Sequence, residues 1–428
     1  MVMFKKIIQY HLRFLARRIL KKYQPLVIGV TGNVGKTSTK EAIYTVMRNH
    51  FNVRRNQKNY NNEMGVPLAI LNQESAGRSL MGWLKVFVNG WNQILFRREF
   101  PEVLILEMGV DRPGDMQYLV NFIHCFVGVV NPIGEIPVHV EFFDTAEDLA
   151  KEKSELIKSL PAGGWAILNY DDPLVRNMRQ LTRAKTVLYG FDERSDLFVS
   201  DISLSRDNHN DPQGLSFKVN YQGKSVPVRL PHILSQEQII NVLAAIACGL
   251  ALELNLLEIV ESLRSLSPLA GRMRLISGIK NSLILDDSYN AAPKAMLAAL
   301  DVLALFDARR RVAILGDMLE LGGQSEKAHR QVGLKVAQVA DILITVGLRA
   351  KFIAQTAQKQ GLAPARIYQY DDIGSAMAQI EEIIRSGDAI LVKASQGMRF
   401  EKIVKDIMAE PLRAKELLVR QDNSWLRK

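Results

Sequence analysis

The chain has 428 residues, of which 47% are hydrophobic and 23% are charged. This length predicts two or three domains, and this composition excludes a largely disordered chain. No apolar run approaches the roughly 18 residues that cross a bilayer, and no signal peptide is evident, so we expect a cytoplasmic protein. The two cysteines, Cys125 and Cys248, are expected to be reduced core residues and cannot form a zinc site alone.

The net charge of +10 is concentrated at the start of the chain. Residues 1–22 contain seven lysines and arginines and no acidic residue, so the rest of the chain is close to balanced. No nucleic-acid-binding motif accompanies this charge, and we expect no nucleic-acid partner.

Residues 1–23 are predicted to form a basic amphipathic helix that ends at Gln24-Pro25. Two interpretations stay open for it. The helix packs on the next domain, or it lies on an anionic membrane surface, at the inner face of the membrane or beside a lipid-linked substrate. A second stretch, 81–98, is rich in aromatic residues and bounded by basic ones. We interpret it as a core helix in preference to a second membrane-surface element.

A glycine-rich turn lies between a predicted strand and a predicted helix. The apolar run 26–30 is typical of a short buried strand, and 40–47 is compatible with a helix. The turn between them reads Thr31-Gly32-Asn33-Val34-Gly35-Lys36-Thr37-Ser38. Its glycines let backbone N–H groups approach phosphate oxygens at a helix N-terminus, which carries partial positive charge. Lys36 can neutralise phosphate charge and the Thr37 hydroxyl can bind Mg²⁺, so the sequence predicts a nucleotide phosphate site.

Strand and helix patterns alternate after this turn, which predicts an α/β fold with a mostly parallel sheet. The predicted strands of this part are 103–106, 126–130, 165–168 and 186–189. Residues 196–230 show short alternating runs and are expected to add an antiparallel hairpin to the sheet.

A domain boundary is expected at Gly271-Arg272, after a helix predicted over 237–254. Beyond it, apolar runs recur at 283–286, 311–315, 342–346 and 389–392. Helical segments fall between these runs, so the sequence predicts a C-terminal α/β domain of Rossmann-like pattern.

Glu107 directly follows the predicted strand 103–106. Ligands of an open α/β sheet bind at the carboxyl ends of its strands, so a carboxylate here, beside the phosphate loop, is well placed to hold Mg²⁺. A solvated glutamate at a strand end is the alternative interpretation.

The turn Thr31-Gly-x-x-Gly-Lys-Thr resembles the phosphate loop of the Mur ligase superfamily, whose members form amide bonds at the expense of ATP. Further blocks follow in family order, from about residue 26 to about residue 405. The blocks at 59–67, 107–115, 284–293 and 393–399 are similar to those of the MurF-type branch. That branch adds D-alanyl-D-alanine to UDP-muramoyl tripeptide.

After the N-terminal basic amphipathic helix, placed at 1–24, the resemblance implies a central P-loop ATPase domain at 25–272 and a C-terminal ligase domain at 273–428. It implies that ATP converts a substrate carboxylate to an acyl phosphate. An amine such as D-alanyl-D-alanine then displaces phosphate, in peptidoglycan precursor synthesis. A small-molecule or nucleotide-linked peptide is the expected carboxylate partner. Two alternatives stay open: a Mur-like or folylpolyglutamate-type ligase for another carboxylate, and a non-catalytic ATP-binding subunit.

The resemblance also implies which residues form the site. ATP is expected to contact Thr31, Gly32, Asn33, Val34, Gly35, Lys36, Thr37, Ser38, Asn241, Arg272, Asp287 and Asn290. Two Mg²⁺ ions are expected on Thr37, Glu107, His139 and Lys153. The expected catalytic residues are Lys36, His139 and Lys153. The expected substrate-binding residues are Asn59, Asn61, Asn62, Lys393 and Ser395. Lys153 is expected to be carbamylated, since an ammonium there would repel metal whereas a carbamate is a hard oxygen ligand.

The sequence departs from the family pattern in four places. Ser235, Glu237 and Gln238 replace a glycine, a histidine and an asparagine before Asn241, which weakens the expected nucleotide block. Ala292 stands where the family signature at 286–293 has a second asparagine. Gln396 stands where the family has arginine, so bidentate recognition of a carboxylate is lost. MurF-type ligases carry a further N-terminal domain that holds the uridine end of the substrate, whereas one basic helix precedes the loop here. We therefore expect that domain to be absent and the carboxylate substrate to be held differently or to be a different one.

Overall fold

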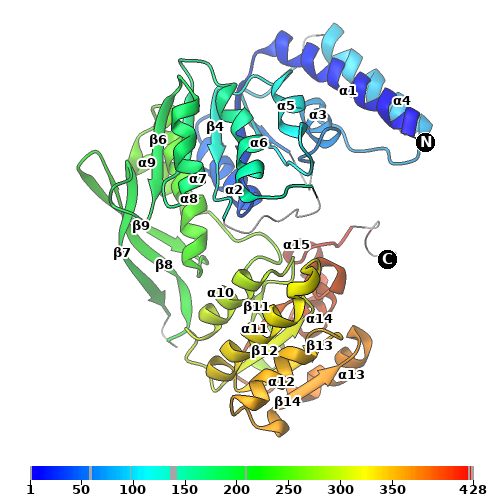
Figure 1. The fold of residues 1–428 in the computed structure, drawn as a ribbon, viewed down its shortest axis with the longest axis vertical. Helices are drawn as coiled ribbons and strands as arrows, with labels where there is room; N and C mark the ends of the chain where they lie inside the picture. The colour runs from blue at the N-terminus through cyan, green and yellow to red at the C-terminus, as the bar shows by residue number, and fades with distance from the viewer. Residues whose placement is uncertain are drawn as a thin grey trace. The chain divides into compact units, whose positions relative to one another are not determined.

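The computed structural model describes residues 2–56, 60–96, 98–134, 142–207, 210–422 and 425, with side chains from Lys5 onward. The chain forms two compact units (Figure 1). The first unit consists of Met1–Ile202, Phe217–Val228 and Gln236–Leu266, and the second of Ser203–Ser216, Arg229–Ser235 and Ser267–Lys428. The predicted domain boundaries at residues 24 and 272 stay predictions.

The first sheet has nine strands. In spatial order they are β2 (Val53–Arg55), β3 (Val103–Glu107), β1 (Leu26–Thr31), β4 (Val127–Val130), β5 (Trp165–Asn169), β6 (Lys185–Gly190), β7 (Leu197–Arg206), β8 (Pro212–Tyr221) and β9 (Lys224–Pro231). Neighbours from β2 through β7 pair in parallel. Both β3 and β4 are fully buried, as parallel strands covered on both faces must be. The predicted mostly parallel sheet is confirmed.

β8 and β9 extend this sheet beyond β7 as an antiparallel hairpin. Asn220 Nδ2 donates to Ser200 Oγ (3.0 Å), and the hydroxyl oxygens of Ser205 and Ser216 lie 2.9 Å apart. These pairings require β7 and β8 to run in opposite directions. The hairpin predicted over 196–230 is therefore present.

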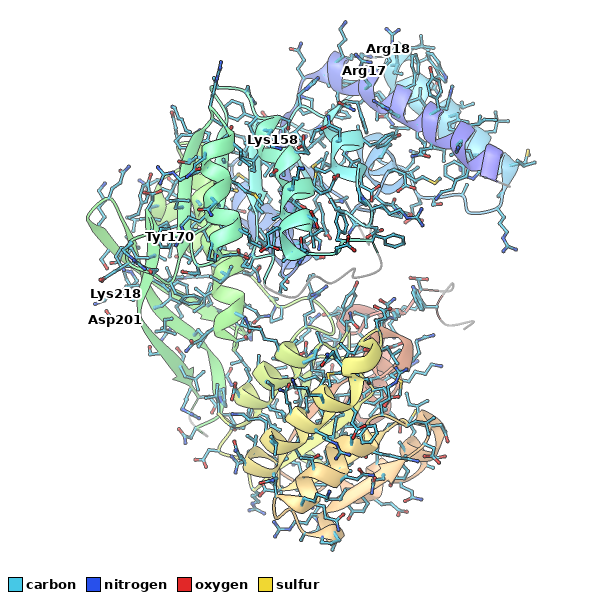
Figure 2. All side chains as sticks on the ribbon, viewed as in Figure 1. Arg17, Arg18, Lys158, Tyr170, Asp201 and Lys218 are labelled. Carbon is cyan, nitrogen blue, oxygen red and sulfur yellow. The ribbon has the colours of Figure 1, made fainter. Side chains whose placement is uncertain are left out.

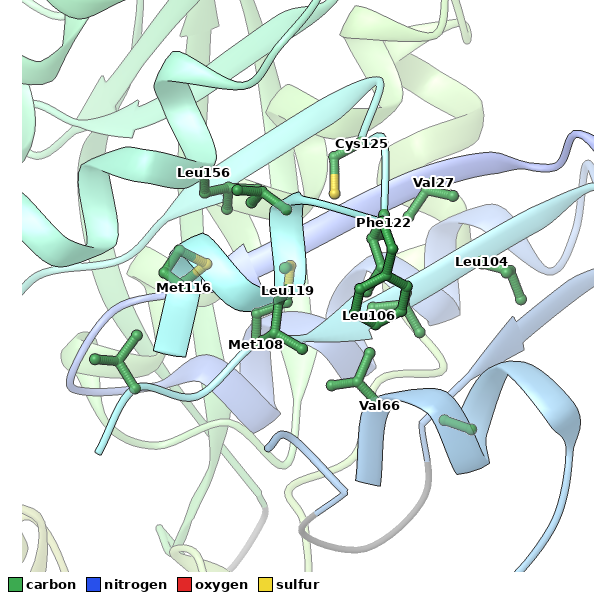
Figure 3. Packing of buried hydrophobic residues seen from close by; sticks show 14 of the residues in the cluster. Val27, Val66, Leu104, Leu106, Met108, Met116, Leu119, Phe122, Cys125 and Leu156 are labelled. Atoms are coloured by element: carbon green, nitrogen blue, oxygen red, sulfur yellow. The ribbon is translucent and has the colours of Figure 1, made fainter. Parts of the chain in front are cut away.

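Helices cover the first sheet. They are α1 (Val2–Tyr23), α2 (Lys36–Met47), α3 (Gly65–Leu71), α4 (Leu80–Leu95), α5 (Asp115–Val120), α6 (Ala146–Lys158), α7 (Pro173–Arg176), α8 (Gln236–Ala251) and α9 (Leu256–Leu263). Figure 3 shows part of the core that they form with β1 and β3. Cys125 lies in this core, where burial raises the pKa of its thiol to about 12. Cys125 and Cys248 are both buried and free, as predicted.

None of the helices in the described ranges combines the length and the apolarity needed to cross a membrane.

α1 packs on the first unit through one stripe of its surface. The buried residues of this stripe are spaced to share one side of the helix: Ile8, Leu12, Leu15, Ala16 and Ile19. Lys22 Nζ donates to the carbonyl oxygens of Gln93, Ile94 and Phe96 at the end of α4 (2.8–3.0 Å). The structure confirms the packing interpretation for this side of α1.

α4 satisfies the core-helix interpretation on one side only. Trp83, Val86 and Gly90 are buried, whereas Met81 is 80% and Leu95 68% exposed. A Cβ on Gly90 would lie 2.8 Å from Leu15 Cδ1, so glycine permits the close approach of α1. The sequence does not show which side of this helix is buried, because both sides carry apolar residues. A hydrophobic periodicity identifies the buried side only where the other side is polar.

The second unit contains a six-stranded sheet. In spatial order the strands are β10 (Arg274–Ser277), β11 (Leu283–Asp286), β15 (Asp388–Lys393), β12 (Arg310–Gly316), β13 (Ile342–Val346) and β14 (Ile367–Tyr370). Neighbours are parallel except β10 and β11. Its helices are α10 (Pro293–Leu303), α11 (Ser325–Val339), α12 (Lys351–Lys359), α13 (Ile373–Ile383), α14 (Glu401–Ile407) and α15 (Ala414–Leu417).

Alternate residues of these strands supply two separate cores. Ala313 and Leu315 of β12 pack with α10, α11 and α12, whereas Val312 and Ile314 pack with α13 and α14. Helices thus cover both faces of a largely parallel sheet, and the predicted Rossmann-like domain is confirmed.

Candidate functional site

The phosphate loop joins β1 to α2 at the carboxyl end of β1. Gly32 and Gly35 have φ angles of +133° and +77°, which glycine adopts without steric cost. A Cβ on Gly35 would collide with Asn241 Oδ1, and one on Gly32 would lie 2.6 Å from Asn131 Cβ. The two glycines therefore permit both the turn itself and the close approach of two buried amides.

Lys36 begins α2 and folds back over the loop. Its Nζ donates to the carbonyl oxygens of Gly32 (2.9 Å) and Asn33 (3.2 Å). Thr37 and Ser38 follow in the first turn of α2 and are partly exposed. The N–H groups of a first helical turn have no acceptor within the helix, so this end of α2 is suited to bind an anion.

A layer of hydrogen-bonded side chains supports the loop from the protein interior. Asn131 Nδ2 donates to Thr39 Oγ1 (2.7 Å) and to the carbonyl oxygen of Val34 (3.1 Å), and Thr39 Oγ1 donates to Asn241 Oδ1 (2.9 Å). The structure thus places Asn241 against the loop. Thr39 and Asn131 were not predicted as site residues. Asn131 directly follows β4, and this position at the carboxyl end of a strand is the signal that identifies it.

Glu107 ends β3 and lies beside the start of the loop, because it pairs in register with Val30 of β1. It is 4% exposed. Its backbone N–H donates to Asn56 Oδ1 (2.9 Å), and Asn61 Nδ2 donates to Glu107 Oε1 (3.2 Å). The structure therefore joins Glu107 to Asn61, a predicted substrate residue, and adds Asn56, for which the sequence carries no motif.

One carboxylate oxygen of Glu107 is left for a further ligand. Oε2 is buried and has no hydrogen-bond partner among the described residues, and the same holds for the Thr31 hydroxyl. The ammonium of buried Lys40 lies 3.8 Å from Oε2 and donates to the carbonyl oxygen of Asn56 (2.8 Å). Oε2 thus has an ion pair but accepts no hydrogen bond from a described residue, and because buried polar atoms rarely lack one, a hard cation such as Mg²⁺ fits this position.

The described ranges contain no group of three or more His, Cys, Asp or Glu side chains arranged to hold a metal. A cation beside Glu107 would therefore need phosphate and hydroxyl oxygens to complete its coordination. Mg²⁺ commonly binds in this way, with one or two carboxylates and the substrate phosphates.

Lys153 lies on α6 and is 2% exposed. Burial lowers the pKa of its ammonium well below the usual value, and the positive charge of Lys36 lowers the pKa further. Asp111 and Glu152 act in the opposite direction. Lys153 is therefore a buried amine close enough to Lys36 for their charges to interact, and its protonated form is disfavoured.

Two predicted site residues, Asn59 and His139, lie outside the described residues. Asn62 has a clear structural use, because its Oδ1 accepts hydrogen bonds from the N–H groups of Met64 (3.2 Å) and Gly65 (2.9 Å) at the start of α3. Its role in substrate binding stays a prediction.

The second unit brings four predicted residues into one cluster: Asp287, Asn290, Lys393 and Ser395. β11 and β15 are parallel neighbours, with Asp286 in register with Val392, so the residues that follow both strands meet at one edge. Lys393 Nζ forms a buried ion pair with Asp287 and donates to the carbonyl oxygen of Asn290 (3.0 Å). Ser395 Oγ donates weakly to the carbonyl oxygen of Ala291 (3.4 Å).

Two adjacent carboxyl groups lie in this cluster. Burial raises the pKa of Asp286 to about 6, although the N–H groups of Ser288 and Gly271 donate to its carboxylate. Burial also raises the pKa of Asp287, and the ammonium of Lys393 opposes that shift. The ion pair therefore favours the charged form of Asp287, whereas Asp286 depends on backbone donors.

Two arginines lie against Tyr289. The guanidinium of Arg272, a predicted ATP contact, is 4.2 Å from the ring centroid, and that of Arg420 is 5.4 Å away. Arg420 also donates to the carbonyl oxygen of Tyr289 (2.6 Å) and pairs with Glu401 (2.9 Å). Arg420 was not predicted as a site residue, because a single arginine near residue 428 carries no motif.

Gly35→Ala is expected to lower the affinity for ATP by about tenfold or more, because the added methyl group collides with Asn241 and φ is +77°. Isothermal titration with ATP and with ADP measures this. Gly361→Ala is the matched control, since Gly361 also has a positive φ (+104°) but nothing within 4 Å of an added Cβ. An unchanged affinity in Gly35→Ala would contradict the assignment of the loop as the phosphate site.

Two family models match the chain. The Mur ligase middle domain matches residues 90–249, and the Mur ligase, glutamate ligase domain matches residues 271–396. Among curated relatives, the UDP-N-acetylmuramoyl-tripeptide–D-alanyl-D-alanine ligase of Bacillus subtilis is 30% identical over 403 residues, which cover 94% of this chain and 80% of the relative. The ligase of the same name from Escherichia coli is 29% identical, over 91% of this chain and 78% of that relative.

Solved structures of the same branch share the fold. MurF from Acinetobacter baumannii aligns with a TM-score of 0.78 at 25% identity, over 93% of this chain and 80% of that one. The MurF ligase from Thermotoga maritima in complex with ADP aligns with a TM-score of 0.74 at 26% identity, over 96% and 84%. Together with the Bacillus subtilis relative, these matches show that the chain belongs to the Mur ligase family, in the MurF branch of ATP-dependent, ADP-forming ligases.

Proposed function

We propose that the protein joins the carboxylate of a UDP-N-acetylmuramoyl tripeptide to the amino group of D-alanyl-D-alanine, with conversion of ATP to ADP and phosphate. The names of the relatives supply these substrates. The observation that carries the proposal is the buried Oε2 of Glu107, to which no described residue donates, at the strand end beside the phosphate loop. A Mg²⁺ ion held by Glu107 would neutralise phosphate charge during phosphoryl transfer from ATP.

In this proposal the ATP phosphates lie on the loop from Thr31 to Ser38. The ammonium of Lys36 moves from the loop carbonyls to the phosphates and offsets the negative charge that develops during transfer. A Mg²⁺ ion held by Thr37 and Glu107 supplies further positive charge when bound. A carboxylate oxygen of the substrate attacks the γ-phosphorus and ADP leaves. The amine nitrogen then attacks the acyl carbon, phosphate leaves, and the nitrogen loses a proton.

We also propose that Lys153 is carbamylated. The neutral amine attacks CO₂, a nitrogen–carbon bond forms, and a proton leaves the nitrogen. Burial and the charge of Lys36 support this step, because a lowered pKa leaves more of the amine neutral at neutral pH. The resulting carbamate and His139 would hold a second Mg²⁺ through oxygen and nitrogen.

The C-terminal domain, proposed at 273–428, would bind the amine. Asp287 and Asn290, together with Arg272 at the preceding boundary, are proposed ATP contacts. Lys393 and Ser395 are proposed contacts of the incoming amine. Their support is the ion pair and hydrogen bonds that hold Lys393 and Asn290 together at one sheet edge.

A second candidate function is a Mur-type ligase for another carboxylate or amine. Gln396 favours it, because its amide cannot form the bidentate ion pair that a guanidinium makes with a carboxylate. The backbone N–H of Gln396 donates to Asn290 Oδ1 (3.2 Å), so this residue belongs to the cluster that the amine would meet.

We further propose that residues 1–23 hold the ligase at the inner face of a membrane, where a lipid-linked substrate is within reach. The support is their charge, since seven basic residues occur there without an acidic one.

The ligase proposal predicts that ADP is released only when ATP, UDP-N-acetylmuramoyl tripeptide and D-alanyl-D-alanine are all present. A coupled assay of ADP with each component omitted in turn measures this, and a panel of amino acids and of muramoyl peptides without UDP extends it. Release with a different pair of substrates would establish the second candidate. ATP binding without ADP release in any combination would contradict both and indicate a non-catalytic subunit.

Lys153→Ala is expected to lower kcat by about a thousandfold or more, as the loss of a group that stabilises transition-state charge does. Lys158→Ala is the matched control, because Lys158 lies on the same helix, is exposed, and pairs only with Glu155 among the described residues. In ¹³C NMR with labelled bicarbonate, wild type and Lys158→Ala are expected to show a carbamate signal that Lys153→Ala lacks. Full activity of Lys153→Ala, or an active wild type without the signal, would contradict the role.

A further inference from the structure

The outer side of α1 and α4 exposes a concentration of apolar side chains. Of the eighteen large apolar side chains that are exposed in the described part of the chain, nine lie here: Ile7, Tyr10, Leu80, Met81, Leu84, Val88, Trp91, Leu95 and Phe96. We call these nine residues the α1–α4 face. Proteins rarely expose an apolar patch of this kind unless it binds a partner or a membrane.

The α4 part of this face is an uninterrupted stripe. Its members recur at alternating steps of three and four residues and so share one side of the helix: Met81, Leu84, Val88, Trp91 and Leu95. Their exposed fractions run from 38% to 80%. The side of α4 that is buried is the opposite one, with Trp83, Val86 and Gly90. Core packing therefore does not explain why the exposed stripe is apolar.

α1 and α4 lie side by side and are firmly joined (Figure 1). The ring of His11 lies 4.6 Å from that of Phe87, and the ring of Phe14 lies 5.8 Å from that of Trp91. Because Trp91 is also a member of the exposed stripe, the apolar surface continues from α4 onto α1. The surface is preformed, since Lys22 ties the end of α1 to the last carbonyl groups of α4.

Basic residues border this face, and neither α1 nor α4 contains an aspartate or a glutamate. Lys6, Arg17 and Lys21 of α1 and Lys85 of α4 are exposed. Figure 2 labels Arg17 together with Arg18 on the C-terminal half of α1. The border therefore presents positive charge with no acidic residue of either helix to neutralise it.

The basic border and the apolar stripe together indicate which kind of partner this face binds. A bilayer with anionic lipids offers phosphate groups to the basic border and acyl chains to the stripe at the same time. The face also contains Trp91 and Tyr10, residue types that prefer the membrane–water interface. A second copy of the chain would instead bring two positively charged borders together, which is unfavourable.

We propose that the α1–α4 face docks on an anionic phospholipid surface, with the α4 stripe inserted among acyl chains and the basic residues of α1 at the headgroups. Both helices then lie in the plane of the interface. The proposal rests on the peripheral location proposed above for residues 1–23 and deepens it, because it assigns the apolar contact to a second helix. It is independent of the ligase chemistry.

Co-sedimentation of the full chain with large unilamellar vesicles tests this docking. Vesicles of phosphatidylcholine with a quarter of phosphatidylglycerol are compared with vesicles of phosphatidylcholine alone, at 50 mM and 500 mM salt. We expect binding to the anionic vesicles at low salt, at least about tenfold weaker binding at high salt, and little binding to the neutral vesicles.

Two pairs of substitutions separate the contributions of charge and apolar contact. Arg17→Gln with Lys21→Gln is expected to weaken vesicle binding by about tenfold or more through lost headgroup attraction. Leu84→Ser with Leu95→Ser is expected to weaken it by about tenfold or more through lost insertion. Matched controls in the second unit are Lys359→Gln with Lys402→Gln and Leu348→Ser with Leu412→Ser, because these four residues are also exposed. The controls are expected to bind vesicles as wild type does.

Every substituted side chain is exposed, so we expect each variant to fold. Thermal unfolding of each variant checks this. Wild-type binding by Leu84→Ser with Leu95→Ser would overturn the proposal, as would equal binding to neutral and anionic vesicles. Light scattering that shows a dimer, with no vesicle binding, would assign the face to a second copy and overturn it as well. A protein that binds vesicles but releases no ADP would contradict the ligase proposal and leave the docking surface supported.

Discussion

The hydrogen bonds from Asn131 to Thr39 and from Thr39 to Asn241 are the interactions on which the candidate site depends. The side chains of Asn131 and Asn241 fill the space beside Gly35, so only glycine fits at this turn of the loop. The same loop begins α2 and lies beside Glu107 through the register of β1 and β3. The residues proposed to bind phosphate and Mg²⁺ are thus held relative to one another by a buried layer of amides and one hydroxyl.

Each unit also places a lysine beside a buried carboxylate at the carboxyl end of its sheet. Lys40 lies near Glu107 in the first unit, and Lys393 pairs with Asp287 in the second. The free energy needed to remove two charges from water is about as large as the free energy of attraction between them. Removing one partner of a buried pair destabilises a protein by about 3–5 kcal/mol. Such pairs therefore add little net stability, and here they hold carboxylates in position at the carboxyl edges of the two sheets.

The sequence predicts the buried strands well and the edge strands poorly. β11 and β13 agree with the predicted runs at both ends, because a strand buried on both faces is a continuous apolar run. β2, β10 and β14 are only partly buried and contain charged or polar residues, so they show no such run. In the site, motifs locate the loop and Glu107, whereas Lys40, Asn56 and Arg420 act through burial and contacts that only the fold creates.

The proposed reaction requires that ATP activates a carboxyl group as an acyl phosphate before the amine nitrogen attacks it. The direct measurement uses a carboxylate substrate labelled with ¹⁸O and mass spectrometry of the phosphate released during turnover. We expect one ¹⁸O atom per turnover to pass from the carboxylate to inorganic phosphate, because the attacking carboxylate oxygen leaves with phosphorus. Amide product formed together with unlabelled phosphate would contradict it.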